Sequence, residues 1–244
     1  MLKTFSITDI GKKRTTNQDF VFTSETPMGN LPNLFLLADG MGGYNGGDFA
    51  SQYAAEVVKA VVLNCHEDNP RKIFEVSIEI ANTEIRRKAQ ETVELDSMGT
   101  TLVAATIIDD SILQVANVGD SRLYVIGDDI RQITNDHSYV EEMIKVGSLD
   151  RKSARNHPQK NIITRAIGAA DEIEPDFFTV KLKKGQVVLM CSDGLTNMMD
   201  DEDIYNIVKG EGDLEDKAKK LVSLANDNGG KDNVSVILAD PFAD

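Results

Sequence analysis

The sequence has few cysteines and no long uninterrupted apolar run. Its two cysteines, Cys65 and Cys191, lie far apart and among apolar neighbours. Such cysteines are typical of the reduced core of a cytoplasmic protein, so we expect no disulfide. Residues 1–14 contain no apolar core followed by a small-residue cleavage site, and nowhere do about eighteen consecutive apolar residues occur. We therefore expect a cytoplasmic protein that is not exported and does not insert into a membrane.

Basic residues are also scarce. Only 26 Lys and Arg stand against 40 Asp and Glu, which gives a formal net charge of −14. This charge repels nucleic-acid phosphates and anionic membrane surfaces, so we expect no nucleic-acid partner. The excess carboxylates either keep the protein in solution or gather around cations, and their positions have to decide between these alternatives.

Linkers, low-complexity tracts and repeats of fixed period are absent, so no boundary divides the chain. With 41% hydrophobic residues, 244 residues suffice for one large core. We therefore expect a single domain over residues 1–244.

Most of the core is predicted to be β-sheet. Short β-branched runs bounded by turn residues predict strands at 34–39, 100–108, 111–119, 121–127, 186–194 and 233–240, with another directly after Asp19. Asp109-Asp110 predicts a tight hairpin, and a further turn begins at Gly127. These short connections favour an antiparallel meander over parallel βαβ winding.

Helices are expected in two pairs. Apolar residues at helical spacing form stripes at Phe49, Tyr53, Val57 and Val61; at Phe74, Ile78, Ala81, Ile85 and Ala89; at Ile204, Ile207 and Val208; and at Leu214, Ala218 and Leu221. Two packed sheets covered by helix pairs bury all these faces, so we predict an α+β fold, a four-layer α/β/β/α sandwich of two antiparallel sheets. Residues 134–170 interrupt the pattern and predict an exposed flap with one short helix.

Five aspartates stand where predicted strands begin or end. They are Asp19, Asp39, Asp120, Asp193 and Asp232. Each alone is typical of a turn, because Asp-Gly and Asp-Asn are common turn dipeptides. If the strand ends meet, however, five carboxylates crowd one rim and require cations. Oxygen-only ligands favour Mg²⁺ or Mn²⁺ over zinc; calcium stays open, although no EF-hand pattern is present.

Six motifs occur in a fixed order along nearly the whole chain. They are RTTNQD (14–19), ADGMGG (38–43), MGTT (98–101), NVGDSRLY (117–124), CSDGL (191–195) and GGKDNVSV (229–236). This set resembles the metal-dependent Ser/Thr protein phosphatases of type 2C, the PPM family, especially their compact bacterial members. The fold of that family is the sandwich inferred above.

The resemblance implies a site for two Mn²⁺ or Mg²⁺ ions. It makes Asp39 the carboxylate that bridges both ions and Gly40 a backbone-carbonyl ligand. Asp19, Asp193 and Asp232 complete this site directly or through water. Two such ions generate a bridging hydroxide that attacks phosphorus directly, so no protein nucleophile is required.

The resemblance assigns two further roles. Asp120, together with Asp193, matches a weaker third metal site of bacterial relatives. Arg14 matches the arginine that grips the substrate phosphate, and its planar fork can bind two phosphate oxygens. Without the family match, Arg14 would be interpreted as one of three adjacent cations in solvent. The glycines of 42–47 would likewise be interpreted as a flexible connector. Gly99-Thr100-Thr101 is expected to be structural, under the site.

The proton donor for the leaving hydroxyl is left open. Eukaryotic relatives commonly place a histidine directly after the DG pair, where this chain has Met41. Many bacterial relatives place one just after DGMGG, where this chain has Tyr44. The phenol of Tyr44 is one candidate, and a water on the third metal, held by Asp120, is the better one.

Four residues of the flap segment are further candidates. His137 and His157 either touch substrate or make structural hydrogen bonds. Asn161 and Arg165 are expected to anchor the flap. No residue pattern decides between the two interpretations of the histidines.

The main hypothesis is therefore a protein-serine/threonine phosphatase, a phosphoric monoester hydrolase. Its expected partners are phosphorylated proteins, namely substrates of a Ser/Thr kinase and the kinase itself, and we expect a monomer. One alternative is a catalytically weak or inactive regulatory binding module of the same fold. Another is dephosphorylation of sigma-factor regulators, but those relatives carry sensor domains for which this chain has no room. The five carboxylates and Arg14 favour the enzyme.

Overall fold

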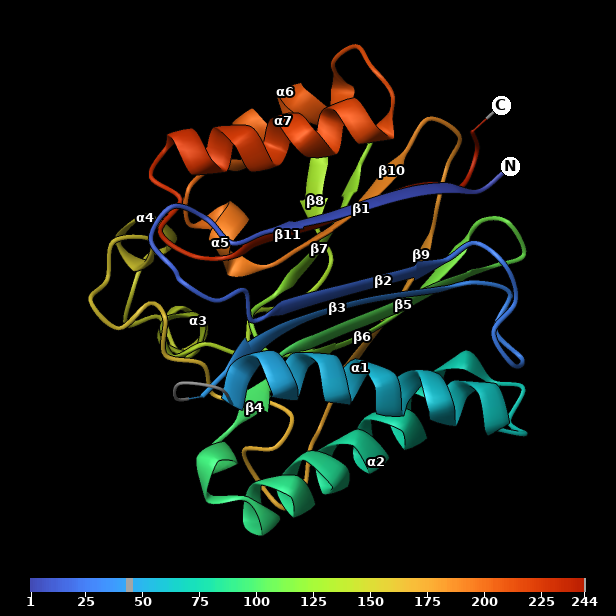
Figure 1. Cartoon of the computed structure of the whole chain (residues 1–244). Coiled ribbons are helices and arrows are strands. Elements are labelled where there is room, and N and C mark those ends of the chain that lie inside the picture. Colours follow the sequence, from blue (N-terminus) through green and yellow to red (C-terminus); the bar gives the residue numbers. More distant parts are fainter. Residues whose placement is uncertain (43–45, 244) are drawn as a thin grey trace.

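Two antiparallel sheets pack face to face, and a layer of helices covers each outer face (Figure 1). The computed structural model describes residues 1–42 and 46–243. Within these ranges the layers follow the order α/β/β/α. The predicted fold class is confirmed.

The first sheet has five strands in the spatial order β1-β11-β10-β7-β8. Their bounds are β1 (Lys3–Asp9), β11 (Val234–Asp240), β10 (Val187–Cys191), β7 (Arg122–Ile126) and β8 (Ile130–Gln132). All of their pairings are antiparallel. The turn predicted at Gly127 joins β7 to β8.

The second sheet has the order β2-β3-β5-β6-β9, and β4 pairs with β3 beside this path. Their bounds are β2 (Asp19–Ser24), β3 (Leu34–Met41), β5 (Leu102–Ile108), β6 (Ile112–Val118), β9 (Asp176–Lys181) and β4 (Gly99–Thr100). The predicted hairpin joins β5 to β6: Asp109 and Asp110 have φ angles of 48° and 55°, the left-handed pair that a type I′ turn requires.

The longer helices of the described residues form the outer layers, with a pair of helices on each sheet (Figure 1). The second sheet is covered by α1 (Gly46–Asn64) and α2 (Pro70–Glu91), and the first by α6 (Asp201–Lys209) and α7 (Leu214–Asp227). Helix α2 begins where Asn69 accepts a hydrogen bond from the Arg71 amide, with Pro70 in the first turn. No helix of the described residues is long and apolar enough to cross a membrane.

The predicted apolar stripe of α1 was wrong in detail. Its buried face consists of smaller residues, including Ala50, Ala54 and Val58, while Phe49 and Tyr53 are only partly buried. Small side chains allow the helix to approach the sheet closely, and the larger rings fill its flanks.

The flap segment contains two short helices, not one. They are α3 (Tyr139–Lys145) and α4 (Arg151–Ala154). The side chains of Ser138 and Asp150 cap their first turns, accepting hydrogen bonds from the amides of Glu141 and Ser153. Two further short helices are η1 (Val93–Leu95) and α5 (Asp193–Thr196).

Strand β3 shows how the sheets position the site. It is buried on both faces: Leu34 and Leu36 pack toward the helices, whereas Phe35 and Leu37 pack into the core between the sheets. Because side chains alternate along a strand, Asp39 continues the inter-sheet face of Phe35 and Leu37. The apolar face that β3 turns toward the other sheet therefore ends at the carboxylate of Asp39.

Candidate active site

Asp19 and Asp39 are directly paired residues on neighbouring strands. The antiparallel register of β2 and β3 places them opposite one another. Strand β3 does not end at Asp39, because β4 pairs with Gly40 and Met41 and extends it. The Asp39 amide donates to Thr101 Oγ1 at 3.0 Å, and its carbonyl accepts from the Thr101 amide at 2.9 Å. The interpretation of Asp39 as a turn residue is therefore wrong, and Gly99-Thr100-Thr101 has the expected structural place under the site.

Three further carboxylates come from the ends of other strands. Asp120 follows β6, Asp193 is the first residue of α5 after β10, and Asp232 precedes β11. Together with Asp39 they line one cavity of about 240 Å³. Asp19 lies behind this cavity, 8% exposed. All five predicted carboxylates are thus brought together.

Burial and mutual repulsion perturb these carboxylates. Desolvation, followed by neighbouring carboxylates, raises the pKa of Asp39 and of Asp193 well above the ordinary value. Burial is also the largest cause for Asp19, whose pKa rises to about 6. The pKa of Asp120 rises to about 6, through burial and then the charge of Asp136. The site therefore resists full ionisation unless positive charge is supplied.

The oxygen atoms of this site fit divalent cations. Asp19 Oδ1 is buried without a hydrogen-bond partner among the described residues, while its Oδ2 accepts from Ser192 Oγ at 2.7 Å. An unpartnered buried carboxylate oxygen is costly, and a cation or its water satisfies it. No three described His, Cys, Asp or Glu side chains already converge on one ion position. Water and the carbonyl of Gly40, which lines the cavity, would have to complete the coordination.

Arg14 lies at the mouth of the same cavity. Its Nη2 donates to Asp232 Oδ2 at 2.7 Å, and its side chain remains 49% exposed. That hydrogen bond is the largest cause that raises the pKa of Arg14, so the guanidinium is permanently charged. A half-exposed fixed cation beside buried carboxylates is suited to bind a phosphate group that enters from solvent.

Comparison with known proteins supports one family. The family model for protein phosphatase 2C matches residues 6–234. The protein phosphatase PhpP of Streptococcus pneumoniae is 42% identical over 236 residues, which cover 95% of this chain and 94% of that protein. A serine/threonine phosphatase structure from S. agalactiae superposes with a TM-score of 0.91 at 38% identity, covering 98% of this chain and 99% of the other.

The chain belongs to the protein phosphatase 2C family. It is a serine/threonine protein phosphatase, and the comparisons give no support to an inactive module. Another similar structure, the catalytic domain of PstP in complex with two manganese ions, has a TM-score of 0.86 at 29% identity and covers 98% of this chain and 97% of that one. Metal dependence is a property of the family.

Asn233 is a supporting residue of this phosphatase that the sequence analysis missed. Its side-chain nitrogen Nδ2 donates to the carbonyls of Ile10 and Thr16 at 2.9 and 3.0 Å, and its Oδ1 accepts from the Gln18 backbone amide at 2.9 Å. These bonds fix both ends of the loop that carries Arg14. The only signal in the sequence was a polar residue next to a buried strand.

His137 has a structural place in the phosphatase. It is 3% exposed and lines neither the cavity of the carboxylates nor the two neighbouring cavities, of about 370 and 440 Å³. Its Nδ1 accepts from the Gly119 amide at 3.1 Å, and its Nε2 lies 3.2 Å from Asp176. Burial lowers the pKa of His137. This contact network favours the structural interpretation and ties the start of the flap to the loop of Asp120.

The other flap predictions have different outcomes. Arg165 does anchor the flap, because it bonds to Asp176 at 3.0 Å and to the Glu174 carbonyl at 3.2 Å. Asn161 instead lines the cavity, as Met41 does. His157 accepts from the Gln159 amide at 3.2 Å and lines none of these cavities. Tyr44, like Gly43, lies outside the described residues.

Proposed function

We propose that the chain hydrolyses phosphoserine and phosphothreonine in proteins with the help of Mn²⁺ or Mg²⁺. One observation carries this proposal: Arg14 and four aspartates from separate segments line a single cavity, with Asp19 buried behind it. Asp39, Gly40, Asp193, Asp232 and, through water, Asp19 would hold two ions. When bound, these ions would supply the nucleophile by lowering the pKa of water, and would neutralise phosphoryl charge.

The chain's own residues bind and orient the substrate. Arg14 would exchange its bond with Asp232 for two phosphoryl oxygens, which places the phosphorus atom over the carboxylates. Among the described residues, no serine, cysteine or histidine lines this cavity, so the proposal assigns the attack on phosphorus to water and not to a side chain. Met41 lines it and carries no proton to transfer. We propose that water near Asp120, where Asp120 and Asp193 would hold a weaker third ion, protonates the leaving alkoxide.

The cellular setting is a broader proposal. We propose that residues 1–244 act as one monomeric cytoplasmic domain. Its partners would be proteins phosphorylated by a Ser/Thr kinase, and the kinase itself. This follows from family analogy and from no particular residue.

Release of phosphate from a phosphothreonine peptide tests the proposed site. We expect activity to depend on added Mn²⁺, and Asp39→Asn or Asp193→Asn to lower kcat/KM at least about 100-fold. Asp129→Asn, an exposed carboxylate at the β7–β8 turn, is the matched control and should leave activity unchanged. Full activity in either site variant would overturn the assignment.

A further inference from the structure

A basic cavity adjoins the catalytic one. Arg14, Arg155, Lys160 and Lys231 line this space of about 440 Å³, and Asp232 is the one carboxylate that the described part of the chain brings to it. Asp232 is already hydrogen-bonded to Arg14. In a chain with 40 acidic and 26 basic residues, such a local excess of positive charge runs against the overall composition.

The two cavities share part of their lining at the point where phosphate is expected to bind. Arg14, Asn161 and Asp232 line both of them. A phosphorylated side chain held by Arg14 would therefore place neighbouring residues of its peptide beside the basic cavity.

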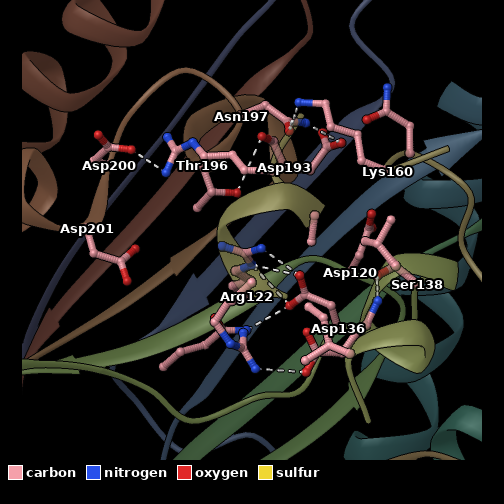
Figure 2. Close-up of a pocket in the computed structure, with 18 residues that line it drawn as sticks. Asp120, Arg122, Asp136, Ser138, Lys160, Asp193, Thr196, Asn197, Asp200 and Asp201 are labelled. Carbon is pink, nitrogen blue, oxygen red and sulfur yellow. Dashed lines mark hydrogen bonds and ion pairs between the residues drawn. The ribbon is translucent and has the colours of Figure 1, made fainter. Parts of the chain in front are cut away.

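A third space, of about 370 Å³, adjoins both cavities and carries more acidic side chains than basic ones (Figure 2). Asp120, Asp136, Glu141, Asp193, Asp200 and Asp201 line it, together with Arg122, Arg151, Arg155 and Lys160. Arg155 and Lys160 also line the basic cavity. An acidic peptide should therefore be attracted more strongly into the basic cavity than into this space.

Two of the cations are available to a ligand. Lys231 is exposed, and none of the described residues forms an ion pair or side-chain hydrogen bond with it. Lys160 Nζ donates to the neutral Asn197 Oδ1 at 2.8 Å and, within residues 1–42 and 46–243, to no carboxylate (Figure 2). Arg155, in contrast, is paired with Asp200 and donates to the Met199 carbonyl.

The backbone holds Lys231 firmly beside the site. Gly230 precedes it with φ of 51°, and the Gly230 carbonyl accepts from the amides of Lys12 and Lys13 at 2.8 and 3.1 Å. Lys160 reaches the same space from the flap, so the cations approach from two separate segments.

We propose that this basic cavity binds an Asp or Glu side chain that flanks the phosphorylated residue, and thereby selects acidic phosphopeptides. The proposal rests on the proposed function, because it names the substrate class of that same site. Lys160 and Lys231 are the specificity-determining residues. In the cavity, a carboxylate of the peptide would pair with their ammonium groups, which form no ion pair with the described residues.

Matched phosphothreonine peptides test this selectivity. One peptide carries Asp and Glu on the N-terminal side of phosphothreonine, a second carries them on the C-terminal side, and a third has Asn and Gln instead. We expect kcat/KM to be higher for at least one acidic peptide. Lys231→Gln and Lys160→Gln should each reduce that preference about three-fold, and the double variant about ten-fold. The preference should also shrink as ionic strength rises.

Controls separate this proposal from the proposed function. Lys152→Gln removes a flap cation that does not line the cavity and should keep the preference. Hydrolysis of p-nitrophenyl phosphate should be unchanged in all three single variants, because that substrate has no flanking residue. An enzyme that hydrolyses all three peptides equally, or that keeps its preference in the double variant, would refute the basic subsite alone. An enzyme inactive on every substrate with Mn²⁺ would instead refute the proposed function.

Discussion

Arg14 should be sensitive even to replacement by lysine. A lysine keeps the charge but cannot bind two phosphoryl oxygens in a plane. We expect Arg14→Lys to lower kcat/KM for a phosphopeptide roughly 10-fold to 100-fold, with little change in Tm because the side chain is 49% exposed. Lys13→Gln removes a cation from the same loop and should keep activity within about two-fold. Equal losses in both variants would mean that only general charge matters.

Asn233 should matter for stability and activity together. Its side chain makes three hydrogen bonds and is nearly buried, so Asn233→Ala leaves the carbonyls of Ile10 and Thr16 without their donor. We expect a loss of about 2–4 kcal/mol in the free energy of unfolding, measured by urea denaturation, together with reduced kcat/KM.

The exposed Asn228 provides the comparison for that variant. It donates a single side-chain bond, to the Met198 carbonyl at 2.9 Å. Asn228→Ala should therefore cost less than about 1 kcal/mol. A loss in Asn233→Ala no larger than this would show that Asn233 does not fix the Arg14 loop.

The difference between Asp39 and Asn233 explains how much of the site the sequence predicts. Asp39 was identified because hydrophobic strands that end in acids repeat along the chain, and the motif order resembles one family. Asn233 makes its bonds to residues more than 200 positions away, at Ile10 and Thr16. Hydrogen bonds of that kind depend on how the strand ends are brought together, so local spacing cannot reveal them.

Strand β3 and helix α1 cross so closely that one added methyl group should disrupt the site. A Cβ on Gly40 would lie 1.8 Å from the carbonyl oxygen of Gly47, and that neighbour is backbone. We expect Gly40→Ala to lower the free energy of unfolding by about 3 kcal/mol or more, measured by chemical denaturation, and to abolish activity. Helix α1 has to move if the alanine is to fit.

Gly147 is the control for backbone strain without crowding. It has φ of +74°, but nothing lies within 4 Å of an added Cβ. Gly147→Ala should cost only about 1 kcal/mol. A similar small cost for Gly40→Ala would show that β3 and α1 separate easily.

The strands that the sequence analysis missed are edge strands. β1, β8 and β9 lie at the edges of their sheets, and most of their residues are only partly buried. The central strands β3, β5 and β10 are buried on both faces, so their apolar runs are long and visible. The β1 sequence KTFSITD mixes polar and apolar residues, and its pairing with the distant β11 is set by the whole fold.

The buried carboxylates link the electrostatics of the site to the stability of the entire protein. The pKa of Asp19 and that of Asp120 are about 6 in the folded, metal-free chain, above the ordinary value of a carboxyl group. A raised folded-state pKa favours the protonated form in the folded protein. Their contribution to stability is therefore complete below about pH 4 and is lost as the pH rises through about 6.

Asp19→Asn should consequently stabilise the metal-free protein at neutral pH. The amide cannot ionise, so the variant avoids a cost on the order of 3 kcal/mol that Asp19 imposes above pH 7, which corresponds to roughly 5–10 °C in Tm. In a chelator, thermal denaturation from pH 4 to pH 8 should show the variant gaining on the wild type as the pH rises. Added Mn²⁺ should reverse this order, because ions bind the folded wild type and compensate its charge. A difference in Tm between variant and wild type that stays constant across this pH range would contradict the raised pKa of Asp19. If Mn²⁺ did not raise the Tm of the wild type, ion binding by these carboxylates would be contradicted.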